Sequence, residues 1–496
     1  MNEFESSRRS GSFAVSAEKE IYGELSFNGP ETLLYLQDNE PFAPLGRPER
    51  CITGVLQDHR KVSLIDCVGP PVPGSGPRGS KRYYFAKVFP HYVVCGRRHI
   101  TPSEKATTKV HFVIDDASTL FYDFDAFGTV LDARPFIEQI SNANALGRTI
   151  VTGPDPAILY FTGKREIFAA DMPLGKVSAS HNPIQNLPGP DGVFLRNKIV
   201  VTIEFEEAIV FNEAIARTLT LSRYFGLLVG RPQNLLELRL RLQSSDEDPI
   251  LLEVYWSMLP KRGPSDDDRR PHPAEVLLDA VHHPTAFSGV LANWLERQPR
   301  WQDARARFLS CFAKQHRYDI DRLIAAANMF DILPTTAVPS EVRISKELEE
   351  AKEQCRQIFT RLKDKESLER VSLLQALGRI GKSSLKRKIH YRAKPIIEVV
   401  GDRFPELIFV INHAVDCRNH YVHGDHESKP KFDYEANRNA VNFLTDTLEF
   451  VFAAADLLEA GWDIKAWCQI GSSMAHPFGA YRVNYKDSLK ELKALL

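Results

Sequence analysis

The stretch LIFVINHAVDCRNHYVHG, residues 407–424, joins an apolar helical stripe to a polar and basic end. Its apolar residues recur at three- and four-residue steps, which predicts an amphipathic helix with one buried face. At about 100° per residue, Arg418 lies within ~20° of Ile411 around the helix axis, so it continues the buried stripe. Gly424 is a natural residue after a helix end, which places His423 in the last turn. The stretch therefore predicts a buried helix that ends in an arginine and a histidine.

The second half of the chain shows the pattern of a helical bundle. Residues 435–460 keep a helical period and stop before Gly461, which predicts a helix packed antiparallel to the one at 404–422. The loop 424–434 between them would then lie beside Arg418. Further helices are predicted at 274–281, 285–298, 301–317, 319–331, 340–363 and 367–380.

The first half of the chain shows the pattern of an antiparallel sheet. Asn28-Gly29 lies between apolar segments and predicts a hairpin, because both turn positions tolerate a positive φ. A second hairpin is predicted around residues 58–60, and the Gly- and Pro-rich residues 69–80 are predicted to form a loop. Asn212 is predicted to cap a helix that ends near Gly230. Strands are predicted at 21–27, 31–37, 52–57, 61–67, 82–88, 91–96, 109–114, 199–205 and 236–242.

The stretch 260–273, PKRGPSDDDRRPHP, separates these two patterns. It is polar, charged and proline-rich and cannot bury apolar surface, so it is predicted to be a linker. Its three aspartates, 266–268, are far more often solvated than metal-binding in such a setting, so neither a metal ion nor a cofactor is expected. The predicted fold class is α+β, with a β-rich mixed domain at 1–259 and an all-α bundle at 274–496.

Composition excludes some classes of protein. The net charge is −1, so any RNA contact must come from a local patch rather than from a global field. Seven cysteines, an odd number without a CxxC pair, argue against a disulfide framework and against a zinc knuckle. The N-terminal stretch MNEFESSRRSGSF lacks the apolar core of a signal peptide, and no apolar run approaches the ~20 residues that span a bilayer. We therefore expect a soluble, cytoplasmic protein without membrane contact.

Arg418, Asn419 and His423 are the parts of a metal-free RNA-cleaving site. A base must take the 2′-hydroxyl proton, an acid must protonate the leaving 5′-oxygen, and a cation must stabilise the phosphate between them. Histidine titrates near neutral pH, and arginine holds phosphate oxygens with a fork of donors that stays charged. Five residues advance about 7.5 Å along a regular helix and turn about 140°, so one pair does not converge tightly. Two facing pairs in a dimer would supply separate acid and base groups.

At this point the sequence resembles a known family. Arg418-Asn419-x-x-x-His423, in a helical bundle, is similar to the signature of the HEPN ribonuclease superfamily. The layout of a β-rich half ahead of the bundle resembles the ApeA-type antiphage proteins of bacteria. The stretches IYGELSF (21–27) and CITGVLQDHRKVSLIDC (51–67) are similar in style to the amino-terminal domain of that family.

The resemblance implies a dimeric, metal-independent endoribonuclease with a composite site at the dimer interface. Its products would carry a 2′,3′-cyclic phosphate and a 5′-hydroxyl. Arg418 takes the place of the family arginine, His423 that of the histidine, and Asn419 that of the polar residue that commonly follows the arginine. The β-rich half would sense an infection cue, such as a phage-derived trigger, and release the nuclease in abortive defence. The substrate stays open among messenger RNA, tRNA and rRNA.

The residues alone leave other readings open. Arg418 and His423 can stabilise a helix C-terminus, where cations are favoured, and Asn419 can cap the helix or bond a loop carbonyl. The basic stretch 382–394 suits single-stranded RNA through phosphate charge and base stacking on its tyrosine, although such runs are usually solvated. Its candidate RNA-binding residues are Lys386, Arg387, Lys388 and Arg392.

Two other functions compete with the nuclease. The bundle could dimerise and bind RNA or a protein partner without cutting it. The chain could also be a toxin that a separate antitoxin silences. Retention of all biological effect by a His423→Ala variant would favour the first of these rivals, and harmless expression of the chain alone would weigh against the second.

Overall fold

The computed structural model divides the chain into two compact units, Met1–Ser288 and Gly289–Leu496. The boundary falls inside helix α4, Pro284–Phe312. Of the predicted linker, only residues 271–273 belong to the described part of the chain. The described part comprises all residues except 1–5, 17, 43–50, 71, 79–80, 144–146, 148–149, 187–188, 244–248, 260–270, 340–344, 363–366, 382 and 424–430.

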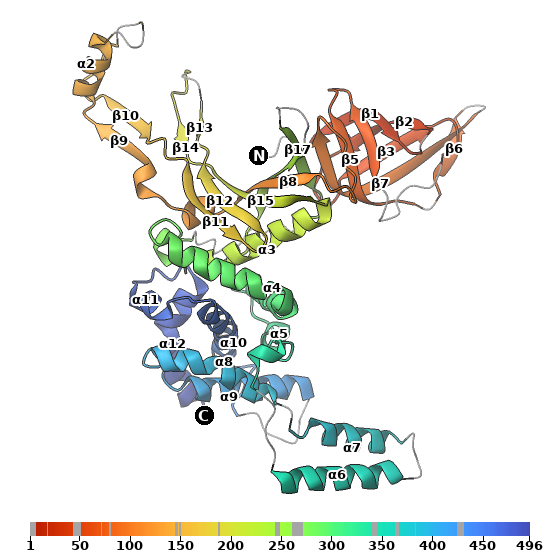
Figure 1. Ribbon diagram of the computed structural model, residues 1–496, viewed down its shortest axis with the longest axis vertical. Coiled ribbons are helices and arrows are strands. Elements are labelled where there is room, and N and C mark those ends of the chain that lie inside the picture. Colours follow the sequence, from red (N-terminus) through yellow and green to blue (C-terminus); the bar gives the residue numbers. More distant parts are fainter. Residues whose placement is uncertain are drawn as a thin grey trace. The chain divides into compact units, whose positions relative to one another are not determined.

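Six antiparallel strands of the N-terminal unit close into a ring around an apolar core (Figure 1). Strand β5 pairs with β4 on one side and with β7 on the other, which completes the circle. Gly54 allows two strands to approach closely, because a Cβ there would lie 2.6 Å from the Phe13 ring. In order around the ring the strands are β7 Lys81–Gly96, β3 Leu33–Asp38, β2 Glu20–Ser26, β1 Arg8–Ala14, β4 Ile52–Leu56 and β5 Lys61–Val68.

Both predicted hairpins are confirmed in this ring. The turn at Asn28-Gly29 joins β2 to β3, with Gly29 at a φ of +50°. The second turn joins β4 to β5, and His59 takes the positive φ there, at +64°. Paired strands that flank short turns are the arrangement that alternating apolar patterns favour.

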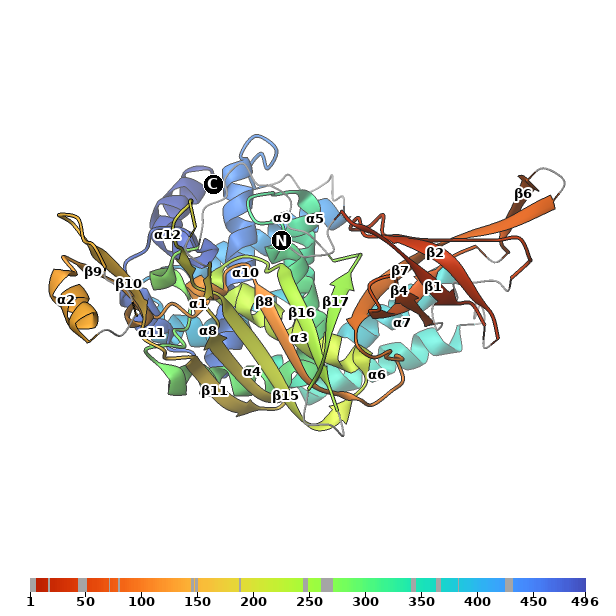
Figure 2. The same cartoon turned by 90° about the horizontal axis from the view of Figure 1, so that it is seen from above.

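Two other predictions for this unit are wrong. Residues 69–80 are not only loop, because β6, Gly74–Arg78, pairs with β7. The strands predicted at 82–88 and 91–96 are one continuous strand, β7, whose length is visible in Figure 2. Pro90 lies within it, opposite Cys67, because the fixed φ of proline is compatible with an extended chain.

The rest of the large sheet continues from β7 as an open antiparallel layer. Helix α3, Phe211–Val229, packs on strands β8 and β15 of this layer (Figure 1). The helix ends at Gly230 with a φ of +96°, as predicted, but Val210 rather than Asn212 is its N-cap. From β7 outward the strands are β17 Ile250–Trp256, β16 Leu235–Leu242, β8 Thr107–Ile114, β15 Ile199–Ile209, β12 Gly175–His181 and β11 Glu166–Met172.

Smaller elements complete the N-terminal unit. Two further pairs of strands lie outside the large sheet. The exposed helix α2 contributes no buried residue. The elements are α1 Ala117–Leu120, η1 Phe124–Ala126, β9 Phe127–Leu131, α2 Arg134–Asn142, β10 Ala157–Phe161, β13 Ile184–Gln185, β14 Leu195–Arg196 and η2 Pro273–Glu275.

The C-terminal unit is helical throughout its described elements. Helices α5, α8, α9 and α10 contact one another, and α12 covers a further side of α10. Helices α6 and α7 pack side by side (Figure 1). The bounds are α5 Ile320–Asn328, η3 Thr335–Ala337, α6 Lys346–Arg361, α7 Leu368–Arg379, α8 Leu385–Val400, α9 Leu407–His423, α10 Arg438–Glu459, α11 Ile464–Gln469 and α12 Pro477–Ala494.

Several helix predictions need correction. The helices predicted at 285–298 and 301–317 are one helix, α4, which continues through Pro299. The helix predicted at 274–281 is replaced by the single turn Pro273–Glu275. Helix α8 was not predicted, because basic residues and Pro395 interrupt its apolar pattern. No helix among the described residues is long and apolar enough to cross a membrane.

Candidate active site

Helix α9 places the predicted motif at the end of a buried helix. Leu407, Val410, Ile411 and Ala414 are at most 1% exposed, so the apolar stripe faces the bundle interior as predicted. The helix continues to His423. The motif therefore begins where the stripe reaches the half-buried Arg418.

Two neutral amides hold the guanidinium of Arg418. One Nη donates to Asn328 Oδ1 at 2.8 Å, from the last residue of α5, and the other donates to Asn419 Oδ1 at 3.1 Å. The Nε–H is buried and has no hydrogen-bond partner among the described residues. A buried unpaired donor costs about 1–3 kcal/mol, a cost that an anion beside the guanidinium would remove. Arg418 is thus held by two amides and, within the described part of the chain, by no carboxylate.

His423 closes the helix, but its side chain lies outside the described residues, as does Gly424. The regular helix separates the two motif positions by about 7.5 Å along its axis and about 140° around it. Within one helix, the arginine and the histidine therefore do not face the same point. A shared site requires a second pair from another copy, or a change of the backbone after His423.

An aromatic cluster lies beside the motif. The rings of His420, Tyr421 and Phe432 surround Tyr434, with centroid distances from 4.7 to 6.0 Å. Tyr421 Oη donates to Glu435 Oε1 at 3.1 Å, which ties the end of α9 to the segment before α10. Burial raises the pKa of Tyr434 to about 12, so this hydroxyl stays protonated at neutral pH. The cluster packs the end of α9 against the segment before α10.

The predicted RNA-binding segment forms the start of α8. Arg387 is exposed, and Lys386 lies 3.5 Å from Asp416 of α9, two residues before Arg418. Lys388 bonds Asp331 at 3.0 Å and is mostly covered. The start of α8 thus lies beside the motif helix, and Arg387 is more accessible there than Lys386 or Lys388.

Arg392 takes a position that does not suit the predicted role. Its side chain is 1% exposed, pairs with Glu459 of α10, and lies over the Trp301 ring at 5.0 Å. Apolar residues of α8 surround it because position 392 falls on the buried face of the helix. A direct RNA contact would require this helix to move, so we do not keep Arg392 among the candidate RNA contacts.

Asn328 is the residue that sequence reasoning misses. It precedes Arg418 by 90 positions and belongs to no motif. Only the packing of α5 against α9 brings the two together. Among the described residues, no group of three or more His, Cys, Asp or Glu side chains is placed to hold a metal ion.

Two family descriptions match the chain. The one described as ApeA N-terminal domain 1 matches residues 8–294, more than half of the chain, and the one described as Apea-like HEPN matches residues 324–465. The chain belongs to the ApeA family. No curated protein and no solved structure matches it significantly. The Arg418–His423 motif lies inside the HEPN match, and this membership supports a HEPN nuclease-like role in antiphage defence.

Proposed function

We propose that this ApeA-family chain is a metal-independent endoribonuclease whose site contains Arg418, Asn419 and His423. The observation that carries the proposal is the state of Arg418. It stands at the end of a buried helix inside the HEPN match, and among the described residues its guanidinium is held by two amides and by no carboxylate. An arginine in that state is suited to receive a phosphate.

Each residue has a distinct role in the proposed reaction. Arg418 binds the scissile phosphate and stabilises the charge that develops on it. Asn419 and Asn328 orient the guanidinium. His423 moves the proton, as base toward the 2′-hydroxyl or as acid toward the leaving 5′-oxygen, and a second copy supplies the complementary group. The products carry a 2′,3′-cyclic phosphate and a 5′-hydroxyl.

The N-terminal unit is proposed to regulate the nuclease during phage infection. The support is the two-unit organisation of the chain and the match of its first part to the ApeA N-terminal domain. A phage-derived trigger would relieve inhibition, and cleavage of host RNA would then stop growth of the infected cell. If infection changes neither RNA cleavage nor growth in cells that carry the full chain, this regulatory part of the proposal is lost.

The test compares purified wild type with Arg418→Ala and His423→Ala on total cellular RNA in EDTA, followed by analysis of the RNA ends. Removal of the phosphate-binding charge is expected to lower cleavage by ~10²–10³. Removal of the proton-transfer group is expected to lower it by ~10²–10⁴. Arg438→Ala and His413→Ala are matched controls, from the start of α10 and the middle of α9, and are expected to cleave nearly as wild type does.

Two outcomes count against the proposal. Loss of cleavage in EDTA with recovery on Mg²⁺ would remove the metal-independent mechanism. Equal behaviour of wild type and both motif variants, also in extract from infected cells, would favour a binding module that does not cut RNA. A circular dichroism spectrum and melting temperature for each variant separate loss of chemistry from loss of fold.

A mixing experiment tests the composite site. Wild type and His423→Ala protein are unfolded together, refolded and assayed at several ratios. If both copies supply a histidine, activity follows the square of the wild-type fraction, about a quarter at equal amounts. A linear dependence would place a complete site in each single chain.

A further inference from the structure

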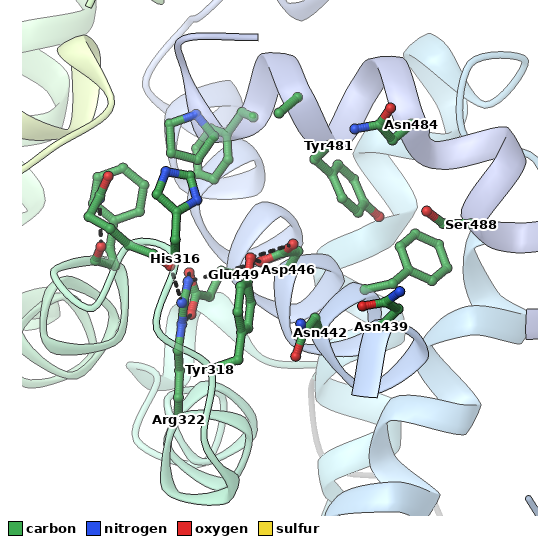
Figure 3. Close-up of a pocket in the computed structure, with 16 residues that line it drawn as sticks. His316, Tyr318, Arg322, Asn439, Asn442, Asp446, Glu449, Tyr481, Asn484 and Ser488 are labelled. Carbon is green, nitrogen blue, oxygen red and sulfur yellow. Dashed lines mark hydrogen bonds and ion pairs between the residues drawn. The ribbon is translucent and has the colours of Figure 1, made fainter. Parts of the chain in front are cut away.

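A pocket of about 270 Å³ opens on the C-terminal unit (Figure 3). Its walls come from α10, from α12 and from the segment that leads into α5. The volume lies at the lower limit of sites that bind small molecules, so the pocket suits a single ring or a compact cation. Neither Arg418 nor Asn419 is among the described residues that line it.

The carboxylate of Asp446 lies in this pocket and shares its nearest cation, Arg322, with Glu449. Asp446 accepts from Tyr318 Oη, at 2.8 and 2.9 Å to its two oxygens. The neighbouring Arg322 is committed elsewhere, since it binds Glu449 through two donors at 2.7 and 3.0 Å and approaches Asp446 only to 3.9 Å. When ionised, Asp446 therefore leaves one negative charge in the pocket uncompensated.

Polar side chains with free hydrogen-bonding capacity surround this carboxylate. Asn442 shares helix α10 with Asp446, and Asn484 and Ser488 face the pocket from α12 (Figure 3). In the described part of the chain, the side chains of these three residues make no hydrogen bond. They are available to contact the remaining polar edges of a ligand.

Aromatic side chains form the flat walls of the pocket. Phe443 and Tyr481 line it with stacked rings, 5.9 Å between centroids, and Phe478 adds a third ring. Tyr481 Oη donates to Thr447 Oγ1 at 3.0 Å, which fixes the orientation of that ring. Flat apolar walls beside an uncompensated carboxylate favour a planar ligand that carries N–H donors.

We propose that this pocket binds a small ligand that presents two adjacent N–H donors to Asp446, as a guanine base or a guanidinium group does. The paired donors match the two oxygens of the carboxylate. The ring or plane of the ligand lies against the aromatic wall, and Asn442, Asn484 and Ser488 contact its other polar atoms. The proposal holds whether or not the chain cleaves RNA.

The experiment measures binding to the full-length protein by titration calorimetry with guanosine, inosine and agmatine. Guanosine carries the donor pair on an aromatic ring, agmatine carries it on a cation, and inosine lacks the 2-amino donor. Inosine is expected to bind at least tenfold more weakly than guanosine, because it lacks one of the two hydrogen bonds that guanosine donates to the carboxylate. Binding by guanosine alone identifies a base site, and binding by agmatine alone identifies a cation site.

The variants connect binding to the pocket. Asp446→Asn is expected to weaken whichever probe binds by at least tenfold. Asn442→Ala, which loses no hydrogen bond within the described protein, is expected to weaken it a few-fold without a change in melting temperature. The matched control Asp487→Asn removes an exposed carboxylate of α12 that does not line the pocket, and its effect is expected to stay below twofold.

Three results would overturn the proposal. The first is no heat of binding from guanosine or agmatine at millimolar concentration. The second is equal binding of guanosine and inosine in the absence of agmatine binding. The third is a folded Asp446→Asn protein that binds the probes as tightly as wild type does.

Discussion

Two arginines of the C-terminal unit, Arg305 and Arg418, show how a structural site differs from a candidate catalytic one. Arg305 binds both oxygens of Asp456 at 2.9 Å and also donates to the Trp294 carbonyl and to Gln298. Its guanidinium lies 3.8 Å from the centroid of the Trp294 ring. Within the described part of the chain, Arg418 has two neutral hydrogen-bond partners, and its Nε has none.

The two environments differ in the positive charge and the hydrogen-bond donors that they leave available to a ligand. Around Arg305 the charge is neutralised and the donors are used, so the residue has no capacity for a ligand. Around Arg418 the orientation is fixed while the positive charge is retained. Helix capping alone would require the charge but not two amide side chains from different helices, so this contrast favours a phosphate-binding role for Arg418.

The largest effect expected from this comparison is on stability. Arg305→Met removes two charged hydrogen bonds from the buried Asp456 and leaves it with Arg297 at 2.9 Å, which is expected to cost about 3 kcal/mol of unfolding free energy. RNA cleavage per folded molecule should stay unchanged. Urea denaturation measures the first quantity, and cleavage assayed at low temperature measures the second.

Two further variants control that measurement. Arg300→Met changes an exposed arginine of the same helix and should leave the unfolding free energy nearly unchanged. Arg305→Met combined with Asp456→Leu removes both charges and should recover part of the lost stability. If Arg305→Met alone is as stable as wild type, Arg305 is not the structural member of the comparison.

The next prediction concerns a variant that gives Arg418 a carboxylate partner, as Arg305 has. Asn328→Asp would place a carboxylate at the position that now lies 2.8 Å from its Nη. The charge would be neutralised while the geometry is kept, so cleavage is expected to fall about tenfold with no loss of stability. Asn328→Ala keeps the charge and should cost less activity. Wild-type cleavage by the aspartate variant would show that the free charge of Arg418 is not needed.

The contrast between Arg418 and Arg305 marks where sequence reasoning works and where it ends. The stripe of α9 and the hairpins at Gly29 and His59 follow from local periodicity and turn chemistry, so the sequence predicts them. The partner Asn328 and the pair of Arg305 with Asp456, 151 positions apart, depend on tertiary packing. No local pattern encodes such contacts.

The basic residues of α8 also show that a local sequence pattern does not reveal which side chains are exposed. The basic residues between 386 and 392 look equivalent in sequence. In the structure, α8 exposes Arg387 to solvent and buries Arg392 in the interior. The helix was not predicted, so its buried face could not be separated from its exposed face. Correct periodicity is therefore a condition for any residue-level prediction of RNA contact.

A smaller effect is expected for the exposed part of that run. Lys386→Ala combined with Arg387→Ala should weaken RNA binding a few-fold and lower the salt slope by up to about 0.7 for each lost phosphate contact. Arg392→Met should instead lower stability and leave the salt slope unchanged. Lys394→Ala, an exposed control on the same helix, should change neither. Binding of a fluorescent single-stranded RNA at several salt concentrations measures the slope, and an unchanged slope in the double variant would remove α8 from the interface.

The last effect concerns the pH dependence of stability at Asp446, whose charge is compensated only in part by Arg322 at 3.9 Å. Burial first, and then the charge of Glu449, raise the pKa of Asp446 to about 7, against the opposing influence of Tyr318 and Arg322. The folded protein then binds more protons than the unfolded chain between pH ~4 and ~7, so its unfolding free energy falls as pH rises through that window. Asp446→Asn removes this dependence.

Urea denaturation at pH 5, 6, 7 and 8 checks the prediction. The stability of Asp446→Asn relative to wild type should increase from pH 5 to pH 8. Asp487→Asn should show no such trend. The other titratable groups that face Asp446, namely His316, Glu449 and Tyr481, are the same in both proteins, so their contributions cancel to first order in the difference. A relative stability independent of pH would mean that Asp446 is as well solvated as a surface aspartate. The pocket would then contain only an ordinary solvated carboxylate. The charge of Asp446 could no longer be compared with that of Arg418.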